Sequence, residues 1–274
     1  MKISFLKLAY LLLWWGLPLP GACHSGPGPA GARAGALSGA ALALTDVWAV
    51  TNNIAGIAQL KRPALGAFAQ NRFNLKAFTT VACLGVLPLK PGTSAGVEFS
   101  RFGDKIYNEQ QLGLGLAHQL GPVRLGLKAT LWQVHLEDLG SKRTLALSFG
   151  GQSEIIPQLT FAAHIFNFNQ ARLASYQEER LPTVMAAGLA YQPSAKLFLS
   201  LQAEKDIDLP AEVIAGLEYV LLEKLAFRAG ASPTRKALSG GAGWKAKALQ
   251  IDYALGGHSA LGISNQVSVS YLFP

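Results

Sequence analysis

Charged residues are scarce in this chain of 274 residues. They make up 15% of the sequence, well below the roughly 25% typical of a soluble globular domain. Hydrophobic residues make up 50%. The length would allow one large domain or two small ones, but this balance is unsuited to an ordinary soluble enzyme.

Residues that bind metals or act as nucleophiles are also few. The chain has 2 cysteines, Cys23 and Cys83, and none of its 5 histidines lies at metal-ligand spacing from another His, Cys or carboxylate. No glycine-rich stretch follows a strand and opens a helix, so phosphate cradling has no support. We therefore predict no enzyme activity, no cofactor and no metal site. Cys83 is expected to be a spectator thiol unless Cys23 survives in the mature chain and pairs with it.

The sequence has no apolar run long enough to span a bilayer comfortably. The run from Leu8 to Leu17 follows Lys2 and Lys7, and small or helix-breaking residues continue to Ala22. It is too short for a membrane helix, and its flanks predict a signal peptide at residues 1–22. Cys23 leaves lipidation open beside ordinary cleavage, although the leucine before it lies one place too far away.

Alternation of apolar and small polar residues is what the chain does have. From Val267 to Phe273 the odd positions are Val, Val, Tyr and Phe, with Ser268 and Ser270 among the residues between them. A period of two places the two sets on opposite faces of a β-strand. Because the pattern recurs along the chain behind an export signal, we expect an all-β fold, a transmembrane antiparallel β-barrel.

About fourteen strands are expected, an even number as in bacterial single-chain barrels. Their predicted ranges are 63–72, 75–87, 93–102, 106–119, 122–136, 142–152, 158–166, 183–192, 195–205, 211–221, 224–232, 237–245, 248–256 and 262–273. Leu125, Leu127 and Leu131 illustrate the outward face, while Phe198 breaks the alternation of its strand. Connections after even-numbered strands are very short, and the longest connection, 167–182, follows the seventh strand. This parity predicts a periplasmic N-terminus and longer outer loops.

Charges of both signs fall at lumen-facing positions of the predicted strands. A ring of one sign would indicate ion selectivity, whereas mixed signs favour ion pairs that fill and stiffen a closed barrel. Burial without partners would be costly, so we expect most of these charges to be paired or hydrated. The predicted lumen charges are Glu98, Arg124, Lys128, Glu204, Glu212, Glu218, Arg228, Lys245 and Asp252.

Residues 23–62 precede the first strand and form a predicted plug or periplasmic segment. Small residues from Gly31 to Thr45 suit a short helix and turn packed inside the barrel, and Thr45 or Asp46 is placed to cap the helical turn through Trp48. The key plug residues are Asp46, Trp48, Asn52, Asn53 and Gly56.

This segment resembles the N-terminus of the PorV/PorQ-like outer-membrane proteins of the Bacteroidetes, within the FadL-like β-barrel superfamily. Asp46, Trp48-Ala49, Asn53 and Ala55-Gly56 match the family pattern, while Ile54 stands where the family has proline and a single Asp stands for an acidic pair. The final hairpin from His258 to Phe273 is also similar, although Pro274 follows the terminal aromatic residue. The resemblance implies a fourteen-stranded barrel partly filled by its own N-terminal segment.

Three functions remain open for such a barrel in the outer membrane of a Gram-negative bacterium. The resemblance implies a non-enzymatic accessory or scaffold of type IX protein secretion, bound to secretion-machinery proteins or their exported clients. The alternative is a FadL-like passive transporter of small hydrophobic molecules, and the third is a structural barrel without such partners. Outer-membrane lipid is expected around the wall, where the excess of 24 Lys and Arg over 16 Asp and Glu suits anionic head groups, and nucleic acid is not expected.

A protein partner would bind the longest outer loop. That loop carries Arg172, Tyr176, Glu178, Glu179 and Arg180. Loops held by a rigid scaffold often carry function, but a solvated loop without a partner has the same composition.

Overall fold

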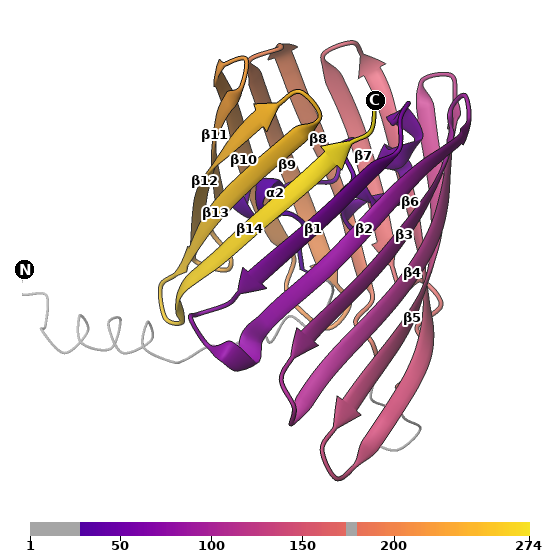
Figure 1. Ribbon diagram of the computed structural model, residues 1–274, viewed down its shortest axis with the longest axis vertical. Helices are drawn as coiled ribbons and strands as arrows, with labels where there is room; N and C mark the ends of the chain where they lie inside the picture. Colours follow the sequence, from indigo (N-terminus) through magenta and orange to yellow (C-terminus); the bar gives the residue numbers. More distant parts are fainter. Residues whose placement is uncertain (1–27, 174–179) are drawn as a thin grey trace, which may run out of the picture.

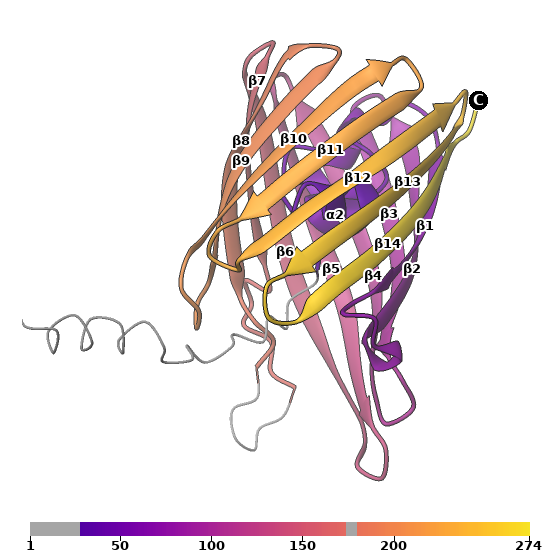
Figure 2. The same ribbon diagram turned by 90° about the vertical axis from the view of Figure 1, so that its left-hand side faces the viewer.

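The chain folds into one closed barrel of antiparallel strands, in which each strand pairs with its neighbours in sequence and β1 closes on β14. The computed structural model describes residues 28–173 and 180–274; the predicted signal peptide and Cys23 lie outside them. Figures 1 and 2 show tilted strands surrounding the N-terminal segment. The strands are β1 (Ala64–Asn71), β2 (Thr79–Lys90), β3 (Thr93–Gly103), β4 (Tyr107–Leu120), β5 (Val123–Leu136), β6 (Gly140–Ile156), β7 (Leu159–Phe166), β8 (Val184–Ser194), β9 (Leu197–Asp206), β10 (Glu212–Leu222), β11 (Leu225–Ser232), β12 (Ala237–Ala246), β13 (Leu249–His258) and β14 (Gly262–Leu272).

The predicted fourteen-stranded barrel is confirmed, with most strand ends within a few residues of expectation. The largest differences are in β2, which begins and ends later than the predicted 75–87, and in β6, which extends on both sides of the predicted 142–152. The residues added to β6 include Glu154 and Ile155, whose side chains are exposed at the barrel end. The alternation of buried and exposed residues weakens there. The apolar–polar pattern in the sequence therefore stops before the backbone hydrogen bonds of the strand do.

The two ends of the barrel differ in the lengths of their connections. Each connection after an even-numbered strand leaves two residues between strand ends, as at 91–92 and 121–122. Connections after odd-numbered strands run from three residues, as at 104–106, to the long loop at 167–183. Short turns at one end and longer loops at the other are typical of outer-membrane barrels, and we call these ends the inner and outer rims.

The exterior of the wall is apolar. Leu114, Leu127 and Leu201 are each more than half exposed, while their chain neighbours Gly113, Lys128 and Gln202 are buried inside. Within the described residues, no helix has the length and apolar character needed to cross a membrane.

The lumen holds the N-terminal segment, which we call the plug and define as residues 30–60. Its elements are α2 (Ala32–Ala36), α3 (Ala49–Asn52) and the 3-10 helix η1 (Ile54–Gln59); a second 3-10 helix, η2 (Lys76–Phe78), lies in the first outer loop. Figure 2 shows α2 enclosed by the strands. The plug divides into two parts, the α2 segment (30–44) against β8–β14 and the Trp48 segment (46–60) against β1–β6.

Candidate functional site: the plug and the lumen

Eight of the nine predicted lumen charges are buried or partly buried on the inner face of the wall. Lys245 differs, because it is exposed near the inner-rim end of β12. Its position has the inward parity of Gly243, but the strand ends one residue later. The alternation alone could not distinguish a lumenal side chain from one at the rim.

Five charged side chains form one connected cluster across the lumen, which we call the arginine cluster. Arg33 of the plug binds Glu218 on β10 through two atoms, at 2.8 Å from Nε and 2.7 Å from Nη2. Its Nη1 lies 3.1 Å from Asp46 of the plug. Glu218 also accepts from Arg228 on β11 at 2.5 Å, and Arg228 reaches Asp252 on β13 at 2.7 Å. The plug is thereby tied to three strands by charge-assisted hydrogen bonds, the stronger class of such bonds.

Burial and neighbouring charges shift the pKa values of Arg33 and Asp46 in the plug. Burial lowers the pKa of the Arg33 guanidinium, but Glu218 and Asp46 outweigh that effect and hold its pKa above the ordinary value. Burial raises the pKa of the Asp46 carboxyl, and Arg33 offsets part of that rise. Asp46 also accepts from the Trp48 amide at 3.0 Å, so it caps the turn that the sequence placed there.

A second set of polar contacts anchors the Trp48 segment. The Thr51 hydroxyl donates to Glu98, whose carboxylate lies 3.0 Å from Lys128 Nζ. Asn53, fully buried, donates from Nδ2 to the Leu42 carbonyl at 2.9 Å. Asn52 binds Ala30 in both directions, accepting at 2.9 Å and donating at 3.0 Å. The plug asparagines therefore hold the two plug segments together.

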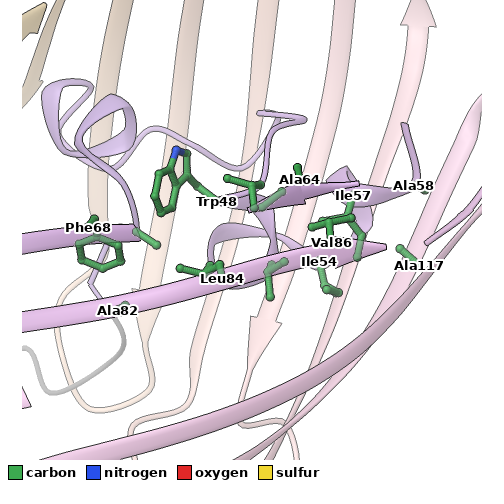
Figure 3. Close-up of a cluster of buried hydrophobic side chains, with 14 residues drawn as sticks. Trp48, Ile54, Ile57, Ala58, Ala64, Phe68, Ala82, Leu84, Val86 and Ala117 are labelled. Carbon is green, nitrogen blue, oxygen red and sulfur yellow. The ribbon is translucent and has the colours of Figure 1, made fainter. Parts of the chain in front are cut away.

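Apolar packing completes the seat of the Trp48 segment. Figure 3 shows Trp48, Ile54 and Ile57 gathered over the inner faces of β1 and β2. All three are at most 1% exposed. Trp48 meets Phe68 edge to face at 5.7 Å between ring centroids, an arrangement that aromatic pairs favour.

Glycines let the plug approach the wall at several points. A Cβ added to Gly230 on β11 would lie 2.3 Å from the Leu37 carbonyl carbon, and one added to Gly126 on β5 would lie 3.0 Å from the Ala55 amide nitrogen. Backbone atoms cannot yield as the tip of a flexible side chain can. A glycine at these positions is the condition for a plug that touches the wall.

A cavity of about 70 Å³ remains between the plug and the wall. It lies toward the outer rim, where the last residue of β7 and the first of β8, Phe166 and Val184, line it with Ile214, His164 and Gln202. Gln202 is 5% exposed, and its Oε1 atom has no hydrogen-bond partner among the described residues. The cavity lining is therefore mixed, with apolar side chains beside polar and charged groups that include Thr51, Glu204 and Arg235.

The long outer loop is described only in part. Arg172 and Arg180 form an isolated antiparallel bridge, while Tyr176, Glu178 and Glu179 lie outside the described residues. Asn167, fully buried, ties the base of the loop by donating to the Leu181 carbonyl at 2.9 Å. The base is thus built into the wall, and the predicted partner-binding role of the loop stays a prediction.

Comparison by sequence finds no match for this chain, whereas comparison with solved structures does. No family model matches the chain. No curated protein matches it either. The toluene transporter TodX of Pseudomonas putida superposes with a TM-score of 0.70 at 11% identity, over 91% of this chain and 100% of that one. The chain has the fold of the FadL-type channels.

Two more FadL-type structures superpose over a similar share of both chains. The monoaromatic hydrocarbon channel CymD has a TM-score of 0.68 at 14% identity, with 92% of this chain and 98% of that chain covered. A FadL homologue of Pseudomonas aeruginosa has a TM-score of 0.65 at 11% identity, with 89% and 98% covered. The FadL-like part of the expected resemblance therefore holds for the fold, whereas nothing found here bears on the PorV/PorQ part.

The sequence did not predict the contacts of three lumenal residues. Arg33 stands in a run of small residues, yet it is the charge in the plug that pairs with Glu218. Arg235, from the β11–β12 loop, pairs with Glu204 at 3.4 Å and with Glu212. Phe198, the exception to its strand's alternation, is 8% exposed and lies under the Arg33 guanidinium at 5.9 Å. The break in alternation was the available signal, because an inward aromatic residue needs something to pack against.

Proposed function

We propose that this protein is a passive route for small hydrophobic molecules across the outer membrane of a Gram-negative bacterium, closed by its plug in the state described. The proposal adopts the second of the functions that the sequence left open. Its main support is the cavity of about 70 Å³ beside the plug, whose lining includes the apolar side chains of Phe166, Val184 and Ile214. The FadL-type fold adds support, since structures of that fold include a monoaromatic hydrocarbon channel and a toluene transporter.

In this proposal the plug is a gate, and the cavity becomes a binding site for the cargo only when the plug moves. An engineered cavity of about 150 Å³ holds benzene, so a volume of about 70 Å³ cannot hold a monoaromatic ring until the plug moves. The buried arginine cluster and Trp48 packing oppose that movement. Transport should therefore depend on displacement of the plug.

A reversible crosslink between plug and wall tests this dependence. The Ser38 and Ser239 hydroxyl oxygens lie 2.7 Å apart, so the pair Ser38→Cys with Ser239→Cys is placed to form a disulfide. Cys83 is replaced by Ala to leave no other thiol among the described residues. Cells carrying the barrel are then supplied with a radiolabelled monoaromatic hydrocarbon, and its initial uptake is measured.

We expect severalfold faster uptake than in cells without the barrel, loss of that gain in the oxidised variant, and recovery on reduction. Each single-cysteine variant is the control for the substitutions themselves. Equal uptake with and without the wild-type barrel would contradict the route. Equal uptake in oxidised and reduced variants would contradict the gate.

A second variant pair opens the plug instead of locking it. Gly230→Val should force the α2 segment off β11, because its Cβ would meet the Leu37 backbone. Gly240→Val is the matched control on β12, since its nearest atom is the Arg228 carbonyl oxygen at an ordinary 3.5 Å. Uptake should rise in the first and stay unchanged in the second.

The secretion scaffold rests on the resemblance around Trp48 and Asn53. It predicts that tagged barrel, crosslinked in cells, carries secretion-machinery subunits or their clients. Recovery of the barrel alone would remove that hypothesis and leave the hydrocarbon route standing.

A further inference from the structure

Strands β3 to β6 present their outward side chains in level rows. Phe99, Leu112, Leu131 and Leu145 are directly paired from strand to strand, and each is 43–51% exposed. The row two residues nearer the outer rim is polar, and we call it the arginine row. It consists of Arg101, Gln110, Gln133 and Arg143, paired in the same way.

The arginine row carries positive charge without compensation. Arg143 donates from Nε to Gln133 Oε1 at 2.6 Å, which lays its guanidinium along the sheet and leaves its two terminal amino groups as donors. Arg101 and Arg143 are both exposed. Neither has a carboxylate partner in residues 28–173 and 180–274.

We propose that the arginine row binds the phosphate of a lipid head group in the outer leaflet. A guanidinium presents a rigid fork that binds phosphate through two parallel hydrogen bonds, unlike the point charge of lysine. The row lies immediately above the leucine-rich row, so one lipid can place its chains on Leu112 and Leu131 and a phosphate on Arg101 or Arg143. Gln110 and Gln133, which lie between the two arginines in the row, offer further amide donors.

The opposite end of the same strands lacks this arrangement. Its outward row is Thr93, His118, Leu125 and Gly151, with no arginine. Basic residues of the inner rim are mainly lysines of the two-residue turns, such as Lys224 and Lys247. The fork-like donors are thus on the side that the long loops identify as outer.

The inference rests on the proposed outer-membrane location but not on the proposed cargo. The test uses the purified full-length barrel in detergent, mixed with a bisphosphorylated lipid A or with its dephosphorylated form, and native mass spectrometry counts bound lipid. Arg101→Gln with Arg143→Gln removes two charges from the row. Lys224→Gln with Lys247→Gln removes two charges from the inner rim and is the matched control.

We expect the wild type and the lysine variant to retain the phosphorylated lipid, and the arginine variant to retain about tenfold less, in line with the strength of charge-assisted pairs. Retention of the dephosphorylated lipid should be low in all three. Unchanged retention by the arginine variant, or an equal loss in the lysine variant, would overturn the proposal. Hydrocarbon uptake by the arginine variant is measured separately, so failure of the lipid site and failure of the transport route give different results.

Discussion

The two plug segments are held in the same lumen by different means. The α2 segment packs alanines and Leu37 against the wall, and it is also tied by the Arg33–Glu218 ion pair and by the Ser239 hydroxyl, which donates to the Ala36 carbonyl at 2.8 Å. The Trp48 segment buries Trp48, Ile54 and Ile57 against β1–β5. Polar ties have strict geometry and are lost when the partners move apart, whereas apolar contacts weaken by degrees as the surfaces slide. A gate would be expected to release its α2 segment first.

Loss of the Trp48 side chain should change the stability of the plug more than the other substitutions argued below. Trp48→Ala removes a side chain that is 1% exposed, and such a truncation costs about 3–5 kcal/mol. Amide hydrogen exchange of the plug should show a lower opening free energy over residues 46–60. The start of the α2 segment should follow, because Gly31 lies against the Trp48 ring.

The control for this variant is a tryptophan on the other side of the wall. Trp244 is 46% exposed on the outer face of β12, so Trp244→Ala should leave plug exchange unchanged. Equal exchange in the Trp48 variant and the wild type would mean that the polar ties alone hold the plug.

Loss of the Glu218 charge should have the next largest effect, and on the other segment. Removing one partner of a buried ion pair costs about 3–5 kcal/mol, and Glu218→Gln should fall at the lower end, about 3 kcal/mol. Arg33 retains Asp46, and Arg228 retains Asp252. Exchange should therefore accelerate over residues 30–41 more than over 46–60.

Glu223→Gln, an exposed position in the turn of the same hairpin, is the matched charge control. If both plug segments opened equally in the Glu218 variant, the plug would be one cooperative unit. The order of release argued above would then be wrong.

The barrel could be predicted from the sequence because its two physical requirements can be recognised from residues that are close together in the chain. No strand may leave a backbone polar group unpaired in lipid, and the outward side chains must be apolar, so Leu125, Leu127 and Leu131 reveal the face without any knowledge of distant residues. The short turns at 121–122 and 223–224 then fix which end is which.

The arrangement inside the lumen could not be predicted in the same way. Arg33 pairs with Glu218, which is 185 positions away in the sequence. No residue near either one indicates that the two will meet. Gly230 likewise appears as one glycine among many until Leu37 is placed against it. Only Phe198 carried a local sign, since an aromatic residue on the inner face of a crowded wall requires a partner.

The smallest of the expected effects concerns the polar tie within the apolar segment. Thr51→Val keeps the shape of the side chain but removes the hydroxyl that donates to Glu98, and a hydrogen bond to a charged group contributes about 1.5–3 kcal/mol. Because Glu98 keeps Lys128 at 3.0 Å, we expect about 1.5 kcal/mol, seen as faster exchange near residues 49–53. Thr93→Val is the control, since its hydroxyl binds the exposed His118 at the inner rim. A loss as large as that from Glu218→Gln would mean that the Trp48 segment also depends on a charged tie, and the contrast between the two segments would then be one of degree only.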